Sequence, residues 1–348
     1  MVYRLWLIAF ALKMIGSTWD MSWHFRWLRD TAAPPHLLNT LGTVIAVALV
    51  LFQARHNVGV DAWAKRLMIV GAGIFLIAIP IDILNHEING LDITAWSPSH
   101  ALLYLGTALM LLGVFRGYWQ STAPSRSRTV VGAVLWGFFL ENVLFPSQQM
   151  EYGVLALKAW LNGAPTAEPD LLRFAADQIG RPVDEIAVRS FALPVDPWVY
   201  PLWIVGAALL TLVAARYFVG ARWTATAIAG GYLAYRVFAW ALLTGTGFPP
   251  SIPPFLLIGG AIVIDLAFLA VANPYARAIA GAVLATAATA AALSAQRFVV
   301  GSPEIDPLAF VWGGIVLAVA WTGLAGLLNR AEQVDQLGQV SSARLLPP

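Results

Sequence analysis

The chain has 348 residues, of which 59% are hydrophobic and only 11% are charged. Soluble domains carry about 25% charged residues, and a soluble domain of this size could not cover its surface with so few charges. The composition excludes a soluble enzyme and a disordered chain, and the absence of Cys excludes a disulfide scaffold and a thiolate metal site. A net charge of +2 is too small to indicate nucleic-acid binding. The sequence therefore predicts an all-α, polytopic membrane protein.

About ten stretches are long and apolar enough to cross a bilayer, whose core of about 30 Å requires about 20 helical residues. They do not alternate in hydrophobicity as barrel strands do, and backbone groups in lipid must be paired internally, so we expect helices. The predicted bundle is built partly from tandem helical hairpins. Its spans are 4–25, 36–54, 67–86, 100–119, 129–147, 198–219, 223–244, 253–273, 276–295 and 307–328.

The predicted organisation has four parts along the chain. Residues 1–120 form two tandem transmembrane hairpins, 121–147 a fifth transmembrane helix, 148–197 an extracytoplasmic cap loop, and 198–348 five further helices with a cytoplasmic tail. Within the loop, the Pro-Asp start and Gly stop of 169–179, and the helical spacing of 183–192, predict two short helices. Such a cap would be either a solvated loop or a functional lid.

Lys and Arg residues orient the predicted bundle. They gather in the short loops on the side of the N-terminus, at Arg55, Lys65, Arg66, Arg126 and Arg128, and are scarce in the short loops on the other side. Positive residues favour the cytoplasmic face. We therefore expect a multi-pass protein of the cell (cytoplasmic) membrane with both termini in the cytoplasm.

An internal repeat holds every histidine except His56. Residues 34–43 and 98–107 both fit P-x-H-x-L-x-x-L-G-T, and a D-x₃-H motif precedes each copy. Spacing of four residues places the Asp and the His on one helix face. A short turn then returns the second His to the same level. The two predicted clusters contain Asp20, His24 and His36 in the first copy, and Asp82, His86 and His100 in the second.

Two imidazoles and a carboxylate that converge from neighbouring helices form a ligand set for a divalent metal. Zn²⁺ accepts such a set with a coordination position left for water, and Fe²⁺ and Cu²⁺ accept it as well. Ionisable residues at membrane depth are costly, which indicates function. Two mononuclear sites and one dinuclear site are both compatible with the spacing, and a proton relay or polar helix packing is the structural alternative.

Other polar residues lie near these clusters. Glu141, an acid within an apolar run, and Glu87 are the candidates for a catalytic acid or base, although helix capping or solvation explains them equally well. Lys13 lies two helical turns before Asp20 on the same face. Arg236 and Asp265 are predicted to form a buried ion pair, because each would be costly alone.

The D-x₃-H…H frame resembles the copper-binding motif of the membrane C subunit of particulate methane and ammonia monooxygenases. That family has twelve residues between the two histidines, whereas this chain has eleven in its first copy and thirteen in its second. The resemblance implies copper as the metal and oxidation as the chemistry. It implies the same ligands, Asp20, His24 and His36, with Asp82, His86 and His100 in the second copy.

The sequence thus favours a membrane metalloprotein with its site at the extracytoplasmic face. We expect a metal-dependent, oxidoreductase-type enzyme that acts on a small or lipophilic substrate, with copper favoured over iron or zinc. A metal or proton transporter, a metal-delivery protein and a subunit of a larger membrane complex remain open. The expected partners are the lipid bilayer, the substrate, and a second copy or other subunits, but no nucleic acid.

Overall fold

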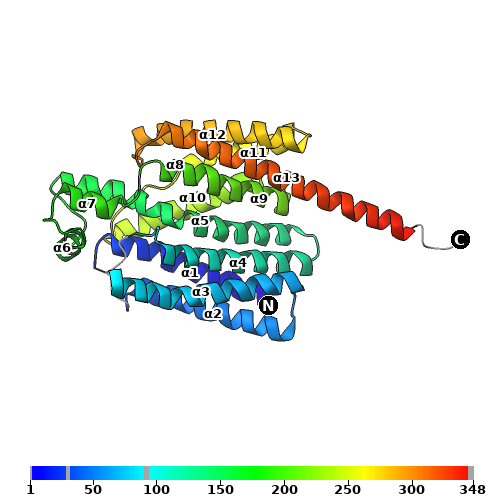
Figure 1. Cartoon of the computed structure of the whole chain (residues 1–348), viewed down its shortest axis with the longest axis horizontal. Coiled ribbons are helices and arrows are strands. Elements are labelled where there is room, and N and C mark those ends of the chain that lie inside the picture. The colour runs from blue at the N-terminus through cyan, green and yellow to red at the C-terminus, as the bar shows by residue number, and fades with distance from the viewer. Residues whose placement is uncertain (1, 29–31, 90–93, 344–348) are drawn as a thin grey trace.

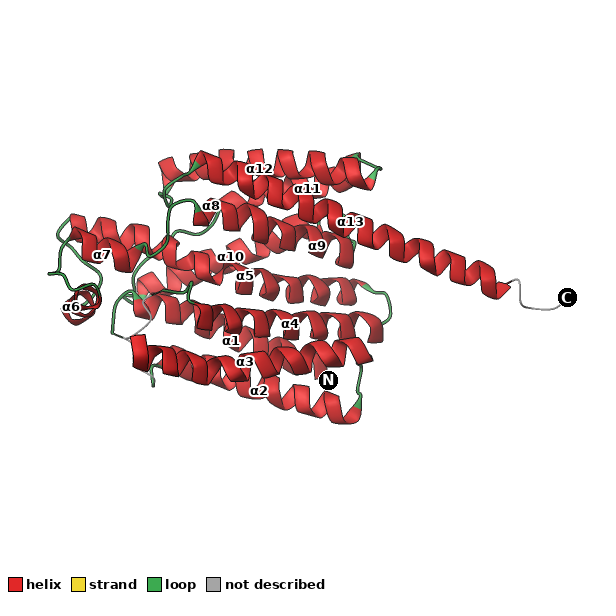
Figure 2. Cartoon of the chain, viewed as in Figure 1, coloured by secondary structure: helices red, strands yellow, loops and turns green. Residues whose placement is uncertain are grey.

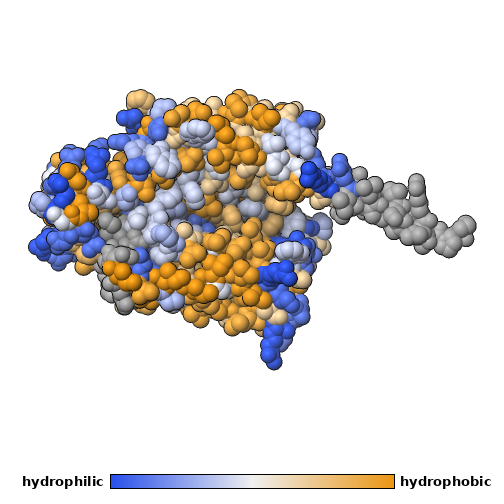
Figure 3. Space-filling model, in the orientation of Figure 1, coloured by the Kyte–Doolittle hydropathy of each residue, from blue (hydrophilic) through white to orange (hydrophobic). Residues whose placement is uncertain are grey.

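The computed structural model describes residues 2–28, 32–89 and 94–343, without the side chains of 86, 87, 89, 332 and 334–343. The described residues contain helices and no strand (Figures 1 and 2). In the space-filling view, an apolar band separates two hydrophilic ends of the bundle (Figure 3). The all-α class predicted from the sequence is confirmed.

Four helices form the N-terminal part of the bundle: α1 (Val2–His24), α2 (Pro34–His56), α3 (Ala62–Asn89) and α4 (Pro98–Ser121). α1 packs mainly on α2, and α3 packs mainly on α4 (Figure 1). Prolines at the first helical positions begin α2 and α4, where the missing N–H has no helical partner. Ser97 caps α4, because its side chain accepts a hydrogen bond from the backbone N–H of His100.

The same close contact joins each of these two pairs. A Cβ on Gly42 would lie 2.7 Å from the carbonyl oxygen of Ala9, and a Cβ on Gly106 would lie 2.7 Å from that of Gly71. Small residues let membrane helices approach at such distances. The two glycines occupy equivalent positions in the P-x-H-x-L-x-x-L-G-T pattern, although the duplication itself stays a prediction.

The next helix, α5 (Arg126–Leu161), continues through Pro146. The span predicted from the sequence ends at 147, where the apolar run gives way to polar residues, so the helix is longer than predicted. Two short helices follow, α6 (Pro169–Gln178) and α7 (Glu185–Ala192), as predicted. With the end of α5 they form a cap over one end of the bundle, opposite the end at which the N-terminus lies (Figure 1).

The rest of the chain completes the bundle with helices that run back and forth along the same axis (Figure 1). α8, η1 and α9 form one continuous rod with a π-helical turn in its middle. The elements are α8 (Val199–Trp203), η1 (Ile204–Ala208), α9 (Leu209–Val219), α10 (Thr224–Gly245), α11 (Leu256–Ala270), α12 (Pro274–Val299) and α13 (Pro307–Ala343).

Eight of the described helices are long and apolar enough to cross a membrane, which makes the chain a multi-pass membrane protein. Many large apolar side chains point outward, for example Val44 at 60% and Ile77 at 61% exposure, as expected against lipid. α1 is not one of the eight, and α11 has only 15 residues. The predicted number of about ten spans is therefore not confirmed.

The predicted ion pair between Arg236 and Asp265 is wrong. Arg236 lies 3.0 Å from Oε2 of Glu151 in α5, and both side chains are 1% exposed. Asp265 instead lies 3.2 Å from Nε of Arg216 and accepts the backbone N–H of Thr226 at the start of α10. The error came from ending α5 at 147, which left Glu151 in a loop and removed it from the list of membrane acids.

Candidate metal centre

The first predicted cluster comes together at the capped end of the bundle. Asp20 and His24 lie one turn apart at the end of α1, and His36 lies in the first turn of α2. Each side chain keeps between 18% and 29% of its surface exposed. The three groups therefore lie at the inner edge of the cap, where they are largely shielded from solvent and still accessible to a small ligand.

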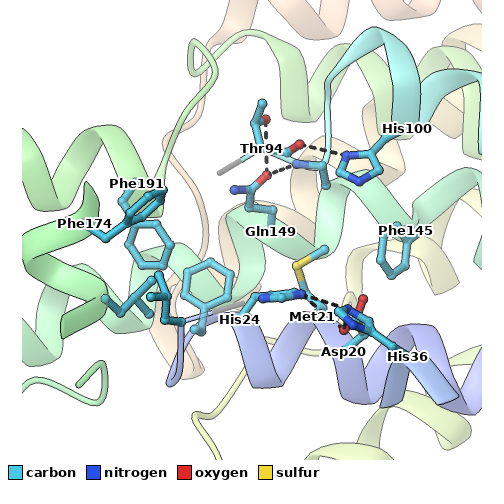
Figure 4. Close-up of a pocket in the computed structure, with 14 residues that line it drawn as sticks. Asp20, Met21, His24, His36, Thr94, His100, Phe145, Gln149, Phe174 and Phe191 are labelled. Carbon is cyan, nitrogen blue, oxygen red and sulfur yellow. Dashed lines mark hydrogen bonds and ion pairs between the residues drawn. The ribbon is translucent and has the colours of Figure 1, made fainter. Parts of the chain in front are cut away.

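The atoms of this cluster converge on one point. Oδ1 of Asp20 lies 2.8 Å from Nε2 of His36 and 3.3 Å from Nε2 of His24, and the two Nε2 atoms lie 3.3 Å apart. Ligand atoms held at about 2.0–2.1 Å by one tetrahedral ion are about 3.3 Å from one another. The three ligand atoms thus have nearly the spacing that a single Zn²⁺-sized cation requires, and they form a possible metal-holding group within the described residues (Figure 4).

The second predicted cluster comes together in part. Oδ1 of Asp82 accepts a hydrogen bond of 2.8 Å from the Ser99 hydroxyl, and it lies 3.7 Å from Nε2 of His100. Nδ1 of His100 lies 3.0 Å from the carbonyl oxygen of Thr94, to which it can donate (Figure 4). A histidine that donates from Nδ1 presents the lone pair of Nε2, which is the usual arrangement of a metal ligand. The side chains of His86 and Glu87 lie outside the described residues.

Both clusters open onto shared space inside the bundle. A first cavity of about 110 Å³, the mouth cavity, lies under the cap and is lined by all three residues of the first cluster and by His100. Phe174 of α6 and Phe191 of α7 close it from the cap side (Figure 4). The cap is therefore part of the wall of the site.

A second cavity of about 200 Å³, the deep cavity, continues from there into the bundle. Asp20, His36 and His100 line both cavities, and Asp82 and Glu141 line the deep cavity. The described side chains of the two predicted clusters therefore face the same interior space, Asp20 and His36 from the α1–α2 pair and Asp82 and His100 from the α3–α4 pair.

Glu141 lies in the wall of the deep cavity, 3% exposed. Its Oε1 accepts hydrogen bonds from the Thr18 hydroxyl at 2.9 Å and from Nε2 of Gln148 at 2.8 Å. The Tyr235 hydroxyl donates in turn to the Thr18 hydroxyl at 2.9 Å. Oε2 of Glu141 has no hydrogen-bond partner among the described residues. This chain of groups fixes the carboxyl group in the wall of the cavity and leaves its second oxygen without a hydrogen bond from the described residues.

No known protein family, curated protein or solved structure matches this chain. Its site is therefore interpreted from its own geometry.

Several residues of this region were not expected from the sequence. Oε1 of Gln149 accepts the backbone N–H of Ala95 at 2.7 Å, which holds the segment before α4 against α5. Gln149 was assigned to the cap loop, as were Gln148 and Glu151. The sequence feature that could have identified these three residues is the polar run just after Pro146. It stands at helical spacing from Glu141, which is typical of a polar helix face that continues past a proline.

Proposed function

We propose that this chain is a membrane metalloprotein that binds one divalent cation through Asp20, His24 and His36. We further propose that it is a metal-dependent enzyme of the oxidoreductase type, acting on a small, lipophilic substrate. The observation that carries the proposal is the convergence of three ligand atoms, all within 4.8 Å of one another, beside a cavity inside the bundle. Copper is our first choice of metal because imidazole suits it and it binds most tightly in the divalent series, and iron and zinc also accept this ligand set.

The geometry supports an enzyme because the ligand set is incomplete. Three protein ligands leave a coordination position toward the cavities, which is typical of catalytic rather than structural metal sites. A metal there would supply redox or Lewis-acid chemistry to a bound molecule. Glu141 is the acid in the same cavity that has a carboxyl oxygen without a partner among the described residues, so we assign it the role of moving a proton. Glu87 remains a candidate from sequence alone.

A lipophilic substrate is supported by a groove on the outside of the bundle. This apolar groove, between α5 and α10, is lined by exposed Val130 and Val134 and shares Met14 and Phe138 with the deep cavity. These two side chains therefore border both the groove and the deep cavity. A molecule dissolved in lipid would have a short path to the site.

The charge distribution supports a site at the extracytoplasmic face. Arg55, Lys65 and Arg126 lie in the helix ends beside the loops that join α2 to α3 and α4 to α5, at the bundle end opposite the cap (Figure 1). Positive loops favour the cytoplasm, so we propose cytoplasmic termini in the cell membrane.

Metal analysis of the detergent-purified protein tests the proposal. We expect about one equivalent of copper or iron, lost in His36→Ala. His56→Ala is the matched control, because His56 ends the same helix at the opposite end of the bundle and is exposed. A wild-type protein that takes up no Cu²⁺, Fe²⁺ or Zn²⁺ on reconstitution, or an equal loss in both variants, would contradict it.

A second measurement separates an enzyme from a metal transporter or delivery protein. For an enzyme, the bound metal should stay with the chain when excess chelating acceptor protein or vesicles are added, and the reduced metal should be reoxidised by O₂. Rapid transfer of the metal to the acceptor, or vectorial uptake by proteoliposomes, would favour delivery or transport instead.

A further inference from the structure

Lys13 is a buried cation in the wall of the deep cavity. Its side chain is 7% exposed, and its Nζ donates to Oδ1 of Asn39 and to Oγ1 of Thr43, each at 3.0 Å. The same Nζ lies 4.1 Å from the centre of the Phe75 ring. Among the described acids, none forms an ion pair with Lys13 within 4.0 Å. The partners of this ammonium group are therefore neutral.

A buried ammonium without a counter-charge is costly, and buried lysines are normally paired. An ammonium group has three N–H donors, and Asn39 and Thr43 take two of them. One N–H donor remains for a group in the cavity, and an anion there would supply the missing counter-charge. The two hydrogen bonds to α2 and the ring of Phe75 hold the amine in place, so little ordering would be needed when an anion binds.

The basic and acidic side chains of the deep cavity lie at different levels along α1. Lys13 and Asp20 share a helix face. The two residues are seven positions apart, which corresponds to about 10 Å along the helix axis. The cavity acids gather toward the metal end, with Asp20 and Asp82 in the two clusters and Glu141 bonded to Thr18. The wall also carries apolar side chains, Phe75, Leu103, Leu111 and Phe138, together with polar ones such as Ser17, Thr107 and Asn142.

We propose that Lys13 is the anchor for the acidic head of the substrate, and that the substrate class is a short apolar carboxylate. Its carboxylate would accept from the remaining N–H of Lys13, its apolar body would lie along the aromatic wall, and its far end would lie beside Asp20, His24 and His36. The position of the far end rests on the proposed metal site. The anchoring of the carboxylate head does not rest on the metal site, because it depends on Lys13 alone.

Binding of octanoate to the detergent-purified, metal-free protein tests the anchor. Calorimetry should show octanoate binding about tenfold or more weakly to Lys13→Met than to wild type, because a charge-assisted hydrogen bond is lost. Lys65→Met is the matched control, since Lys65 bonds to Asn57 at the opposite end of the bundle and does not line the deep cavity, and it should bind octanoate like wild type. Equal affinity in wild type and a folded Lys13→Met would overturn the proposal.

A comparison within the wild type covers the case in which Lys13→Met does not fold. Octanoate should bind at least about tenfold more tightly than octanol, which has the same body without the charge. Equal affinity for the two probes would overturn the anchor.

The orientation is tested with Mn²⁺ or Cu²⁺ at the metal site and nuclear relaxation of bound octanoate. The terminal methyl group should relax fastest, because the carboxylate lies at the far end of the cavity. Fastest relaxation at the carbon beside the carboxylate would overturn the proposal, since the metal would then be the anchor. If no metal binds but Lys13 still controls octanoate affinity, the metal proposal fails and the anchor stands.

Discussion

Nε2 of His36 lies 2.8 Å from Oδ1 of Asp20, although the two residues belong to different helices. If a cation holds these atoms together, it binds the folded protein and not the unfolded chain. A ligand at a hundred times its dissociation constant stabilises the folded state by about 2.7 kcal/mol. We expect Cu²⁺ or Zn²⁺ to raise the melting temperature of the metal-free protein, and Asp20→Asn to abolish this increase. Thermal unfolding in detergent measures it, and a metal effect of full size in Asp20→Asn would contradict the ligand role of Asp20.

The second cluster gives a prediction about stoichiometry. Asp82 is bonded to Ser99 and lies 3.7 Å from His100, whereas the group that meets the geometric requirement for a metal within the described residues is Asp20, His24 and His36. We expect Asp82→Asn to leave the first metal equivalent in place, as metal analysis after dialysis would show. Loss of all metal from Asp82→Asn would instead indicate one dinuclear centre that spans the deep cavity.

Glu151 and Arg236 form an ion pair inside the bundle, with further hydrogen bonds from Tyr200 to Glu151 and from Arg236 to Ser251. Removing one partner of a buried pair leaves the other charge uncompensated and costs about 3–5 kcal/mol. We expect Glu151→Gln and Arg236→Met each to destabilise by about that amount. The double variant should lose much less than the sum. Additive losses, measured by denaturant unfolding in detergent, would show that the two groups do not interact.

Gly71 and Gly73 provide a matched pair on α3. A Cβ on Gly71 would lie 2.6 Å from the carbonyl oxygen of Gly106, whereas a Cβ on Gly73 would meet no atom within 4 Å. We expect Gly71→Ala to destabilise by about 1–3 kcal/mol through overpacking. Gly73→Ala should stabilise by up to about 1 kcal/mol through helix propensity. The order of the two melting temperatures is the test, and the reverse order would contradict the tight packing of α3 on α4.

The ion pair of Asp61 and Arg116 lies at the bundle end opposite the cap. Hydrogen bonds from Arg116, with a further one from the backbone N–H of Ala64, hold the pKa of Asp61 below its ordinary value. A lowered carboxyl pKa stabilises the fold above the pKa of the unfolded chain, about 3.9, and the effect is lost as the pH falls through the folded value. We expect Asp61→Asn to lower the melting temperature at pH 7 and to match wild type near pH 2. The same substitution at exposed Asp177 is the control, and a difference that persists at acidic pH would contradict the assignment.

The sequence predicted the helical class, the two cap helices and the convergence of Asp20, His24 and His36, because each depends on local spacing. Asp20 and His24 follow from a four-residue period, and His36 follows from a short turn. The pairing of Arg236 was not predictable in the same way, since its partner Glu151 lies beyond Pro146 in a helix that local rules end too early. The anchoring of Asp82 by Ser99 and the meeting of both clusters in one cavity depend on how separate helix pairs pack, which a single sequence does not encode in any local pattern.

The contacts of Gly42 with Ala9 and of Gly106 with Gly71 pack the two helices of each pair closely against one another. The deep cavity is lined by both pairs and by α5, so a movement of the two pairs apart as rigid bodies would widen it. His24 and His36 both belong to the α1–α2 pair, which would move as one body. A ligand could then enter and leave the deep cavity while the arrangement of the proposed metal ligands stays unchanged.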